Sequence, residues 1–270
     1  MSEQQQDTFI SHLVELRDRL LRSLLAVGLA FIVLFFYPGS GPIYDFLAAP
    51  LLQALPEGTK MIATGVITPF MVPVKVTALV ALIVVLPYVL YQAWAFVAPG
   101  LYAHEKRLAL PLVIASSVLF LAGIAFCYYF VFGKVFAFIN SFAPQSITPA
   151  PDIEAYFSFV LTMFLAFGVT FEIPVVVVVL ARAGIVTIEQ LKSARPYVIV
   201  GAFVVAAVVT PPDVLSQLLL AIPMCLLYEL GLFLARFMVK PDGESHWKAP
   251  SGAEMDRELD KAEAESKDLK

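Results

Sequence analysis

The sequence has little charge and almost no cysteine. Only 15% of its 270 residues are charged, whereas 60% are hydrophobic, and the mean hydropathy is +0.83. Soluble domains carry about 25% charged residues, so this composition argues against a soluble enzyme core. The two cysteines, Cys127 and Cys225, lie in apolar stretches without a CxxC motif or a Cys/His cluster. No metal site is therefore expected, and both thiols are expected to be small core residues.

Other chemical signatures are missing as well. The chain has no Lys/Arg-rich run with interleaved aromatics, which argues against nucleic acid as a partner. It has no glycine-rich phosphate loop, so ATP use is not expected. No Ser/His pair, HExxH motif or membrane aspartate pair suggests an intramembrane hydrolase. We therefore predict a protein that is not an enzyme and that needs no cofactor.

The sequence is instead rich in long apolar runs. Its aromatic residues lie inside these runs rather than in alternating strands, which disfavours an outer-membrane barrel. A helix that crosses the hydrocarbon core needs roughly 20 apolar residues. Residues 1–240 are therefore predicted to form an all-α integral membrane domain with six transmembrane helices. The candidate spans lie near residues 20–37, 76–98, 108–133, 155–181, 197–210 and 214–235.

The basic residues predict how these spans are oriented. Fifteen of the 18 Lys and Arg residues fall on one side of the predicted membrane, and only Lys60, Lys75 and Lys134 fall on the other. Because basic residues favour the cytoplasmic side, both termini are expected in the cytoplasm. Residues 38–69 are expected to form an ordered outward cap of short helices. Residues 241–270 are dense in charge and are expected to be a disordered or solvated tail.

The last two apolar runs are short. Tyr197–Thr210 has 14 residues, and Val214–Tyr228 has 15 before Glu229 interrupts it. Each stretch spans only about 21 to 23 Å at helical rise, against a hydrocarbon core roughly 30 Å thick. This final hairpin is expected to stop short of one face, to thin the lipid, or to be covered by helices of this chain or of a partner.

One acid lies deep inside an apolar run. Glu172 follows 17 uncharged residues, and an ionised carboxyl near mid-membrane costs at least a few kcal/mol. Pro174 is expected to kink the helix there and to free the carbonyl of Thr170. Glu172 is then either a neutral carboxyl hydrogen-bonded to the bend or a functional group. A proton- or ion-coupled carrier built around Glu172 and Glu229 is the alternative function, although the chain shows no internal repeat.

Three further acids lie at the predicted membrane edges, and each has an ordinary structural explanation. Glu15 and Arg19 are four residues apart on an amphipathic helix, where such a surface pair contributes about 0.3 to 0.5 kcal/mol. Glu105 follows Pro99–Gly100 and enters the first turn of the next helix, where negative charge is favourable. Asp213 is placed to be the N-cap of the last helix.

Four segments in this order nevertheless form a specific combination. They are His12–Leu20, Pro99–Glu105, Phe167–Pro174 and Thr210–Gln217. Together they resemble the TatC family, the signal-receptor subunit of the twin-arginine (Tat) protein translocase, over about residues 8–240.

The resemblance implies a non-enzymatic receptor that binds twin-arginine signal peptides at the cytoplasmic face. It implies that Glu15 and Glu105 receive the paired arginines, with Phe96 nearby. Arg17 and Arg19 are expected to orient Glu15 or to contact the rest of the signal motif. The chemistry is consistent, because guanidinium groups match carboxylates bidentately and two arginines need two separate acids.

The resemblance also implies a glove-like, concave body and a set of partners. Glu172 is expected on the hollow face and Pro50 in the outward cap. Thr210 and Gln217 resemble a polar patch at which the single-span subunits TatA and TatB dock, and Asp213 is expected to end that hairpin. The protein is expected to self-associate in the bacterial inner membrane. It is expected to pass folded proteins across with the proton-motive force.

Overall fold

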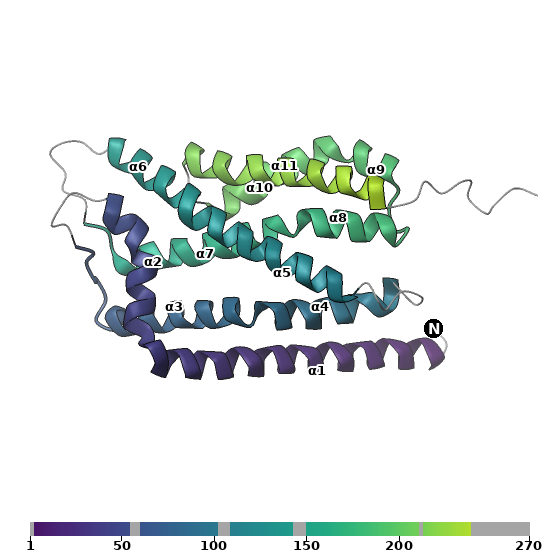
Figure 1. Ribbon diagram of the computed structural model, residues 1–270, viewed down its shortest axis with the longest axis horizontal. Helices are drawn as coiled ribbons and strands as arrows, with labels where there is room; N and C mark the ends of the chain where they lie inside the picture. Colours follow the sequence, from purple (N-terminus) through teal and green to yellow (C-terminus); the bar gives the residue numbers. More distant parts are fainter. Residues whose placement is uncertain (1–2, 55–59, 102–108, 143–149, 211–212, 239–270) are drawn as a thin grey trace, which may run out of the picture.

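The chain folds into an elongated bundle of helices that lie mostly side by side (Figure 1). The computed structural model describes residues 3–54, 60–101, 109–142, 150–210 and 213–238, and these contain helices but no β-strand beyond one isolated bridge. The predicted all-α class is confirmed for this part of the chain. The described chain begins and ends at the same end of the bundle, here called the terminal end (Figure 1). The opposite end, where α2 lies, is called the cap end.

The first helix leads into the predicted cap. α1 (Glu3–Leu34) is followed by a π-helical turn, Phe35–Gly39, in which Gly39 has a positive φ of 97° that favours glycine. The chain then turns into α2 (Ser40–Ala54), which crosses the other helices steeply at the cap end (Figure 1). The prediction of an ordered helix in this connection is confirmed, and Pro50 lies within it.

The second predicted span is a bent pair of helices. The pair consists of α3 (Thr68–Val84) and α4 (Leu86–Leu101). They meet at 60°, so the predicted span over 76–98 contains a bend. Pro87 explains the break, because proline lacks an N–H and its ring clashes with the carbonyl four residues earlier. Lys75 lies inside α3, and its ammonium group pairs with the Glu154 carboxylate at 3.2 Å.

The remaining helices run back and forth between the two ends. They are α5 (Ala109–Phe126), the π-helical turn η3 (Cys127–Val131), α6 (Phe132–Phe142), α7 (Ile153–Phe171), α8 (Ile173–Arg182), α9 (Ile188–Ser193), α10 (Arg195–Val209) and α11 (Val214–Met238). Four described stretches are long and apolar enough to cross a membrane, or five when α3 and α4 count as one span. The helix α10 is a shorter apolar helix.

Only one arm of the final hairpin is short. The helix α10 has 15 residues, about 22 Å at helical rise, as predicted. The helix α11 has 25 residues, about 37 Å, and continues past Glu229, so the helix is longer than the apolar stretch Val214–Tyr228. The Glu229 carboxylate lies 2.7 Å from the Arg195 guanidinium and is half-exposed.

Two cap-end segments that are distant in sequence are joined through Asp152. One carboxylate oxygen accepts hydrogen bonds from the backbone N–H groups of Glu154 and Ala155, which caps α7. The other accepts from the backbone N–H and the hydroxyl of Thr64, at 3.2 and 2.9 Å. These donors hold the pKa of Asp152 below its ordinary value. Asp152 therefore fixes the 60–67 segment against the start of α7.

The core is tightest where α5 passes α7. A Cβ atom on Gly123 of α5 would lie 2.5 Å from the carbonyl oxygen of Phe167, and one on Gly168 of α7 would collide with the Phe120 ring. Small residues allow membrane helices to approach closely, so these glycines set the separation of the two helices.

We predict that Gly123→Ala lowers the midpoint of thermal unfolding, because the methyl group collides with backbone and overpacking costs about 1 to 3 kcal/mol. Gly133→Ala in α6 is the matched control, since a Cβ there meets no atom within 4 Å. Its midpoint should stay unchanged or rise. Unfolding of both variants in the same detergent checks this, and equal midpoints would contradict the packing described above.

Candidate functional site

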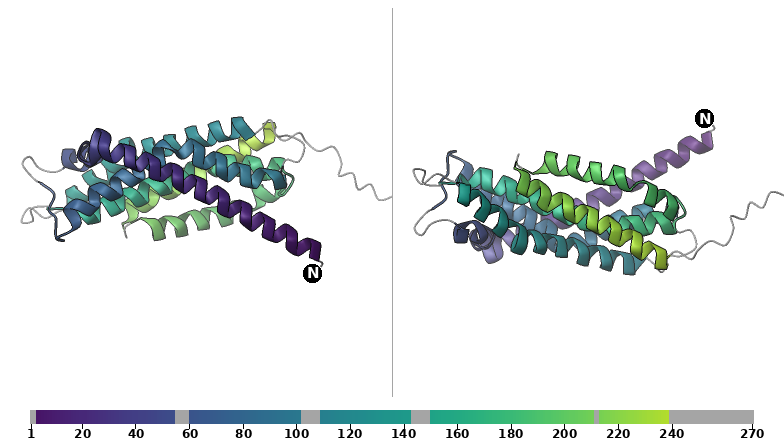
Figure 2. Two further views of the ribbon diagram at one scale, coloured as in Figure 1. Left: turned by 90° about the horizontal axis from the view of Figure 1, so that it is seen from below. Right: turned by 90° about the horizontal axis from the view of Figure 1, so that it is seen from above.

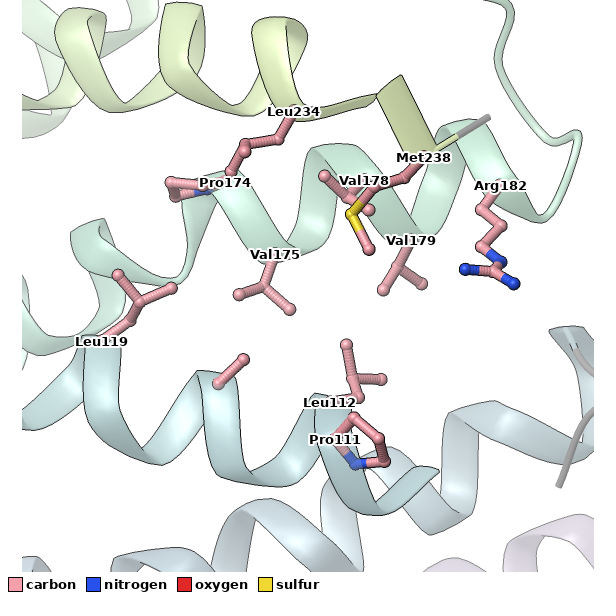
Figure 3. A pocket seen from close by; sticks show the side chains of 11 residues that line it. Pro111, Leu112, Leu119, Pro174, Val175, Val178, Val179, Arg182, Leu234 and Met238 are labelled. Carbon is pink, nitrogen blue, oxygen red and sulfur yellow. The ribbon is translucent and has the colours of Figure 1, made fainter. Parts of the chain in front are cut away.

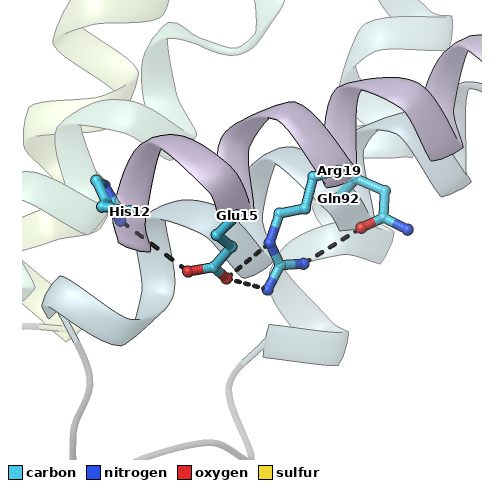
Figure 4. Close-up of polar contacts among 4 residues, drawn as sticks. All are labelled: His12, Glu15, Arg19 and Gln92. Carbon is cyan, nitrogen blue, oxygen red and sulfur yellow. Dashed lines mark hydrogen bonds and ion pairs between the residues drawn. The ribbon is translucent and has the colours of Figure 1, made fainter. Parts of the chain in front are cut away.

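The predicted receptor residues of α1 lie against α4 (Figure 4). One oxygen of Glu15, Oε1, accepts hydrogen bonds from Nε and Nη2 of Arg19 at 2.9 and 2.6 Å. The third guanidinium nitrogen of Arg19, Nη1, donates to Oε1 of Gln92 on α4 at 3.2 Å. The predicted pairing of Glu15 with Arg19 is therefore present. Arg19 also ties this carboxylate to a second helix.

The second oxygen of Glu15 faces an aromatic pair. Nδ1 of His12 lies 4.0 Å from Oε2 of Glu15. The His12 ring stacks on the ring of Phe96 from α4, with ring centroids 4.2 Å apart. The Glu15 side chain stays 37% exposed. Oε1 is thus engaged by Arg19, whereas Oε2 lies 4.0 Å from a ring nitrogen of His12, in a side chain that is partly exposed.

The remaining predicted receptor residues do not all join this group. Arg17 binds the neighbouring Asp18, with Nη2 2.8 Å from Oδ1, rather than Glu15. Glu105 lies outside the described residues, so its distance from Glu15 stays a prediction. The helix that carries Phe96 ends at Leu101, four residues before Glu105.

The sequence interpretation missed two members of the group, His12 and Gln92. His12 precedes Glu15 by about one helical turn, which is a spacing that could have identified it. Gln92 is a polar residue inside an apolar run and is only 5% exposed. A buried amide normally has a hydrogen-bond partner, and the Gln92 amide oxygen accepts a hydrogen bond from Arg19.

Glu172 lies at the junction of α7 and α8, where the predicted break beside Pro174 is present. Both of its carboxyl oxygens are buried, and neither has a hydrogen-bond partner among the described residues. The expected hydrogen bond to the bend is therefore not formed. The hydroxyl of Ser116 on α5 accepts a hydrogen bond from the indole N–H of Trp94 at 2.9 Å.

Glu229, the other acid of the carrier hypothesis, has a different environment. It is 49% exposed and paired with Arg195, so the described contacts do not join it to Glu172 in one site. Carriers bring polar groups together near mid-membrane, and that arrangement is not seen for these two acids. The described residues also contain no group of three or more His, Cys, Asp or Glu that could hold a metal.

The polar residues of the final hairpin are largely engaged within it. Oδ1 of Asp213 accepts from the backbone N–H of Ser216 at 2.7 Å, which confirms Asp213 as a cap of α11. The buried Thr210 hydroxyl donates to the carbonyl of Ala206 within α10. The partly exposed Gln217 amide donates to a carbonyl of α10 at 3.2 Å. Of the three predicted partner-contact residues, Thr210 is buried, whereas Gln217 and Asp213 are partly exposed.

Comparison with known proteins identifies the family. Residues 11–223 match the family model described as Sec-independent protein translocase protein (TatC). The chain belongs to the TatC family. It is 53% identical to the Haemophilus influenzae Sec-independent protein translocase protein TatC over 236 residues, covering 87% of this chain and 91% of that protein. The Escherichia coli TatC is 49% identical over 239 residues, covering 88% and 92% of the two chains.

A solved structure agrees with this assignment. A crystal structure described as the twin-arginine translocase receptor TatC has a TM-score of 0.74 and 40% sequence identity. The match covers 84% of this chain and 99% of that one. The protein is thus a membrane-embedded component of the Sec-independent protein translocase.

We predict that Glu172→Met raises the midpoint of thermal unfolding. A buried carboxyl without a hydrogen-bond partner is unfavourable by about 1 to 3 kcal/mol, and methionine fills a similar volume without polar atoms. Glu229→Met makes the same change at a paired acid and should lower the midpoint slightly, because it leaves Arg195 without its partner. Thermal unfolding in one detergent compares them, and a fall for Glu172→Met as large as that for Glu229→Met would contradict the unpaired state.

Proposed function

We propose that this protein is the receptor subunit of a bacterial twin-arginine translocase and binds twin-arginine signal peptides at the cytoplasmic face of the inner membrane. The strongest support is the arrangement around Glu15. Its carboxylate is held by Arg19 on one side and is open beside His12 and Phe96 on the other. A solved relative is itself described as a twin-arginine translocase receptor.

The geometry suggests how one arginine of the signal peptide is recognised. A guanidinium group that approaches Glu15 finds Oε2 as a charged acceptor, and the His12–Phe96 pair offers aromatic surface for stacking. The Arg19–Gln92 contact restrains the carboxylate before the peptide arrives, which lowers the entropy lost on binding. Arg19 also repels an added cation. The second arginine of the peptide therefore needs a second acid, and we assign Glu105 to that role.

We further propose six membrane crossings, with both termini in the cytoplasm. The described basic residues support this orientation. Arg182 lies in the last turn of α8, Lys192 in α9, Arg195 at the start of α10 and Arg236 near the end of α11, and these parts of the chain meet at the terminal end (Figure 1). Basic residues favour the cytoplasmic side, so the terminal end faces the cytoplasm in this proposal.

Partner subunits are proposed to dock at α10 and α11. A helix of 15 residues falls about 8 Å short of a 30 Å hydrocarbon core, so its ends need lipid thinning or a covering helix. Gln217 offers a partly exposed amide beside this short helix. We propose that single-span TatA and TatB helices bind there and assemble around several receptor copies. Transport of folded proteins is then driven by the proton-motive force.

We predict that Glu15→Gln weakens crosslinking of a twin-arginine signal peptide about fivefold, because a hydrogen bond to a charged carboxylate contributes roughly 1 kcal/mol more than one to a neutral amide. Membrane insertion should be unchanged. A photoreactive group placed next to the two arginines of the peptide measures the effect.

Asp18→Asn is the control for that experiment. It removes the same charge three residues along α1, from an acid that binds Arg17. Crosslinking should stay near the wild-type level. If Asp18→Asn reduces it as much as Glu15→Gln does, the peptide responds to the charge of the helix rather than to the Glu15 site.

We also predict that a photoreactive amino acid at position 217 crosslinks a single-span partner subunit, because that position lies beside the short α10. Leu226 is the control, since it is 65% exposed and lies nine residues further along α11, about 180° around the helix. Crosslinking at 226 that equals or exceeds crosslinking at 217 would rule out this docking face.

A further inference from the structure

An apolar groove opens between α5, α8 and α11 (Figure 3). It encloses about 290 Å³. At its inner end lie Leu119 of α5 and Pro174 of α8, and toward the terminal end lie Arg182 of α8 and Met238 of α11. From Pro174 to Arg182 the groove follows about 12 Å of helix at the usual rise.

The walls of this groove fit a hydrocarbon chain better than a packed helix. Except for Arg182, every lining residue is apolar, and most are Leu, Val or Pro. Membrane helices pack on each other through small residues and interhelical hydrogen bonds, yet Ala115 is the one small residue among those lining the groove. A flexible acyl chain needs neither small residues nor hydrogen-bond partners, and Met238 can adapt to its shape.

The groove carries a positive charge at one end. Arg182 lies in the last turn of α8, and its guanidinium group extends into the space between α8 and α5 (Figure 3). A guanidinium group has five N–H donors in a planar fork that matches phosphate. A hydrocarbon slot with one cation at its mouth is complementary to an anionic lipid.

We propose that this groove binds an anionic phospholipid, with its headgroup phosphate on Arg182 and one acyl chain along α5 and α8. Basic pockets between helices on the cytoplasmic side are typical sites for acidic headgroups, and the terminal end faces that side in the proposed orientation. The site therefore rests on that orientation, but it does not depend on signal-peptide binding. The acyl chain ends beside Pro174, two residues from the buried carboxyl of Glu172.

Native mass spectrometry of the full chain released from nanodiscs tests the site. The nanodiscs contain equal amounts of phosphatidylglycerol and phosphatidylcholine, and the ratio of retained lipids is measured. The wild type should retain phosphatidylglycerol preferentially. Arg182→Gln should reduce this preference about fivefold, the effect expected from one basic residue near the membrane surface. Arg182→Lys keeps the positive charge and should largely preserve it.

Two matched variants separate the groove from general charge. Arg236→Gln removes the same charge from the exposed face of α11 that lies opposite the groove residue Leu234, so its lipid preference should equal that of the wild type. Ala115→Phe fills the groove while keeping Arg182, and it should reduce retention of both lipids.

Each of three results would overturn the proposal. The first is equal lipid preference in Arg182→Gln and the wild type. The second is an equal loss of preference in Arg182→Gln and Arg236→Gln. The third is unchanged retention in Ala115→Phe, which also decides the question if Arg182→Gln does not fold. Loss of signal-peptide crosslinking in Glu15→Gln leaves all three outcomes unaffected.

Discussion

The structure depends on one constraint. Where the surroundings offer no hydrogen-bond donors or acceptors, the backbone N–H and C=O groups must bond to each other within the chain. A protein that exposes large apolar side chains along whole helices, such as Leu24 and Leu29 of α1, is suited to lipid rather than water. In lipid, a regular helix is the backbone state of lowest free energy, because it satisfies its own N–H and C=O groups. At every break in a helix, other groups of the protein must supply the missing hydrogen-bond partners. The bundle is therefore built from long helices, and its irregular places are few.

Part of the polar chemistry lies at those irregular places. Glu172 lies where α7 passes into α8. Gln217 and Asp213 lie beside the turn between α10 and α11. A receptor needs polar groups, but a polar side chain exposed to lipid is energetically unfavourable. Breaks in helices and the ends of helices supply positions where the protein can hold such groups.

Much of this fold could be predicted from the apolar runs, because helices in lipid follow local composition. What the sequence could not predict is pairing between residues far apart along the chain. The ion pairs Lys75–Glu154 and Arg195–Glu229 are examples. In the site, the local Glu15–Arg19 pair was predictable from its spacing. The contact of Arg19 with Gln92 spans 73 residues and leaves no local pattern.

The central claim is that carboxylates at the cytoplasmic surface recognise two arginines as guanidinium groups rather than as positive charges. Co-purification of the intact complex with a signal-bearing precursor tests this directly, with the two arginines either kept or both changed to lysine. Lysine keeps the charge but loses the planar fork that matches a carboxylate. The account predicts that the arginine precursor is retained and that the lysine precursor is lost. Equal retention of the two would contradict it.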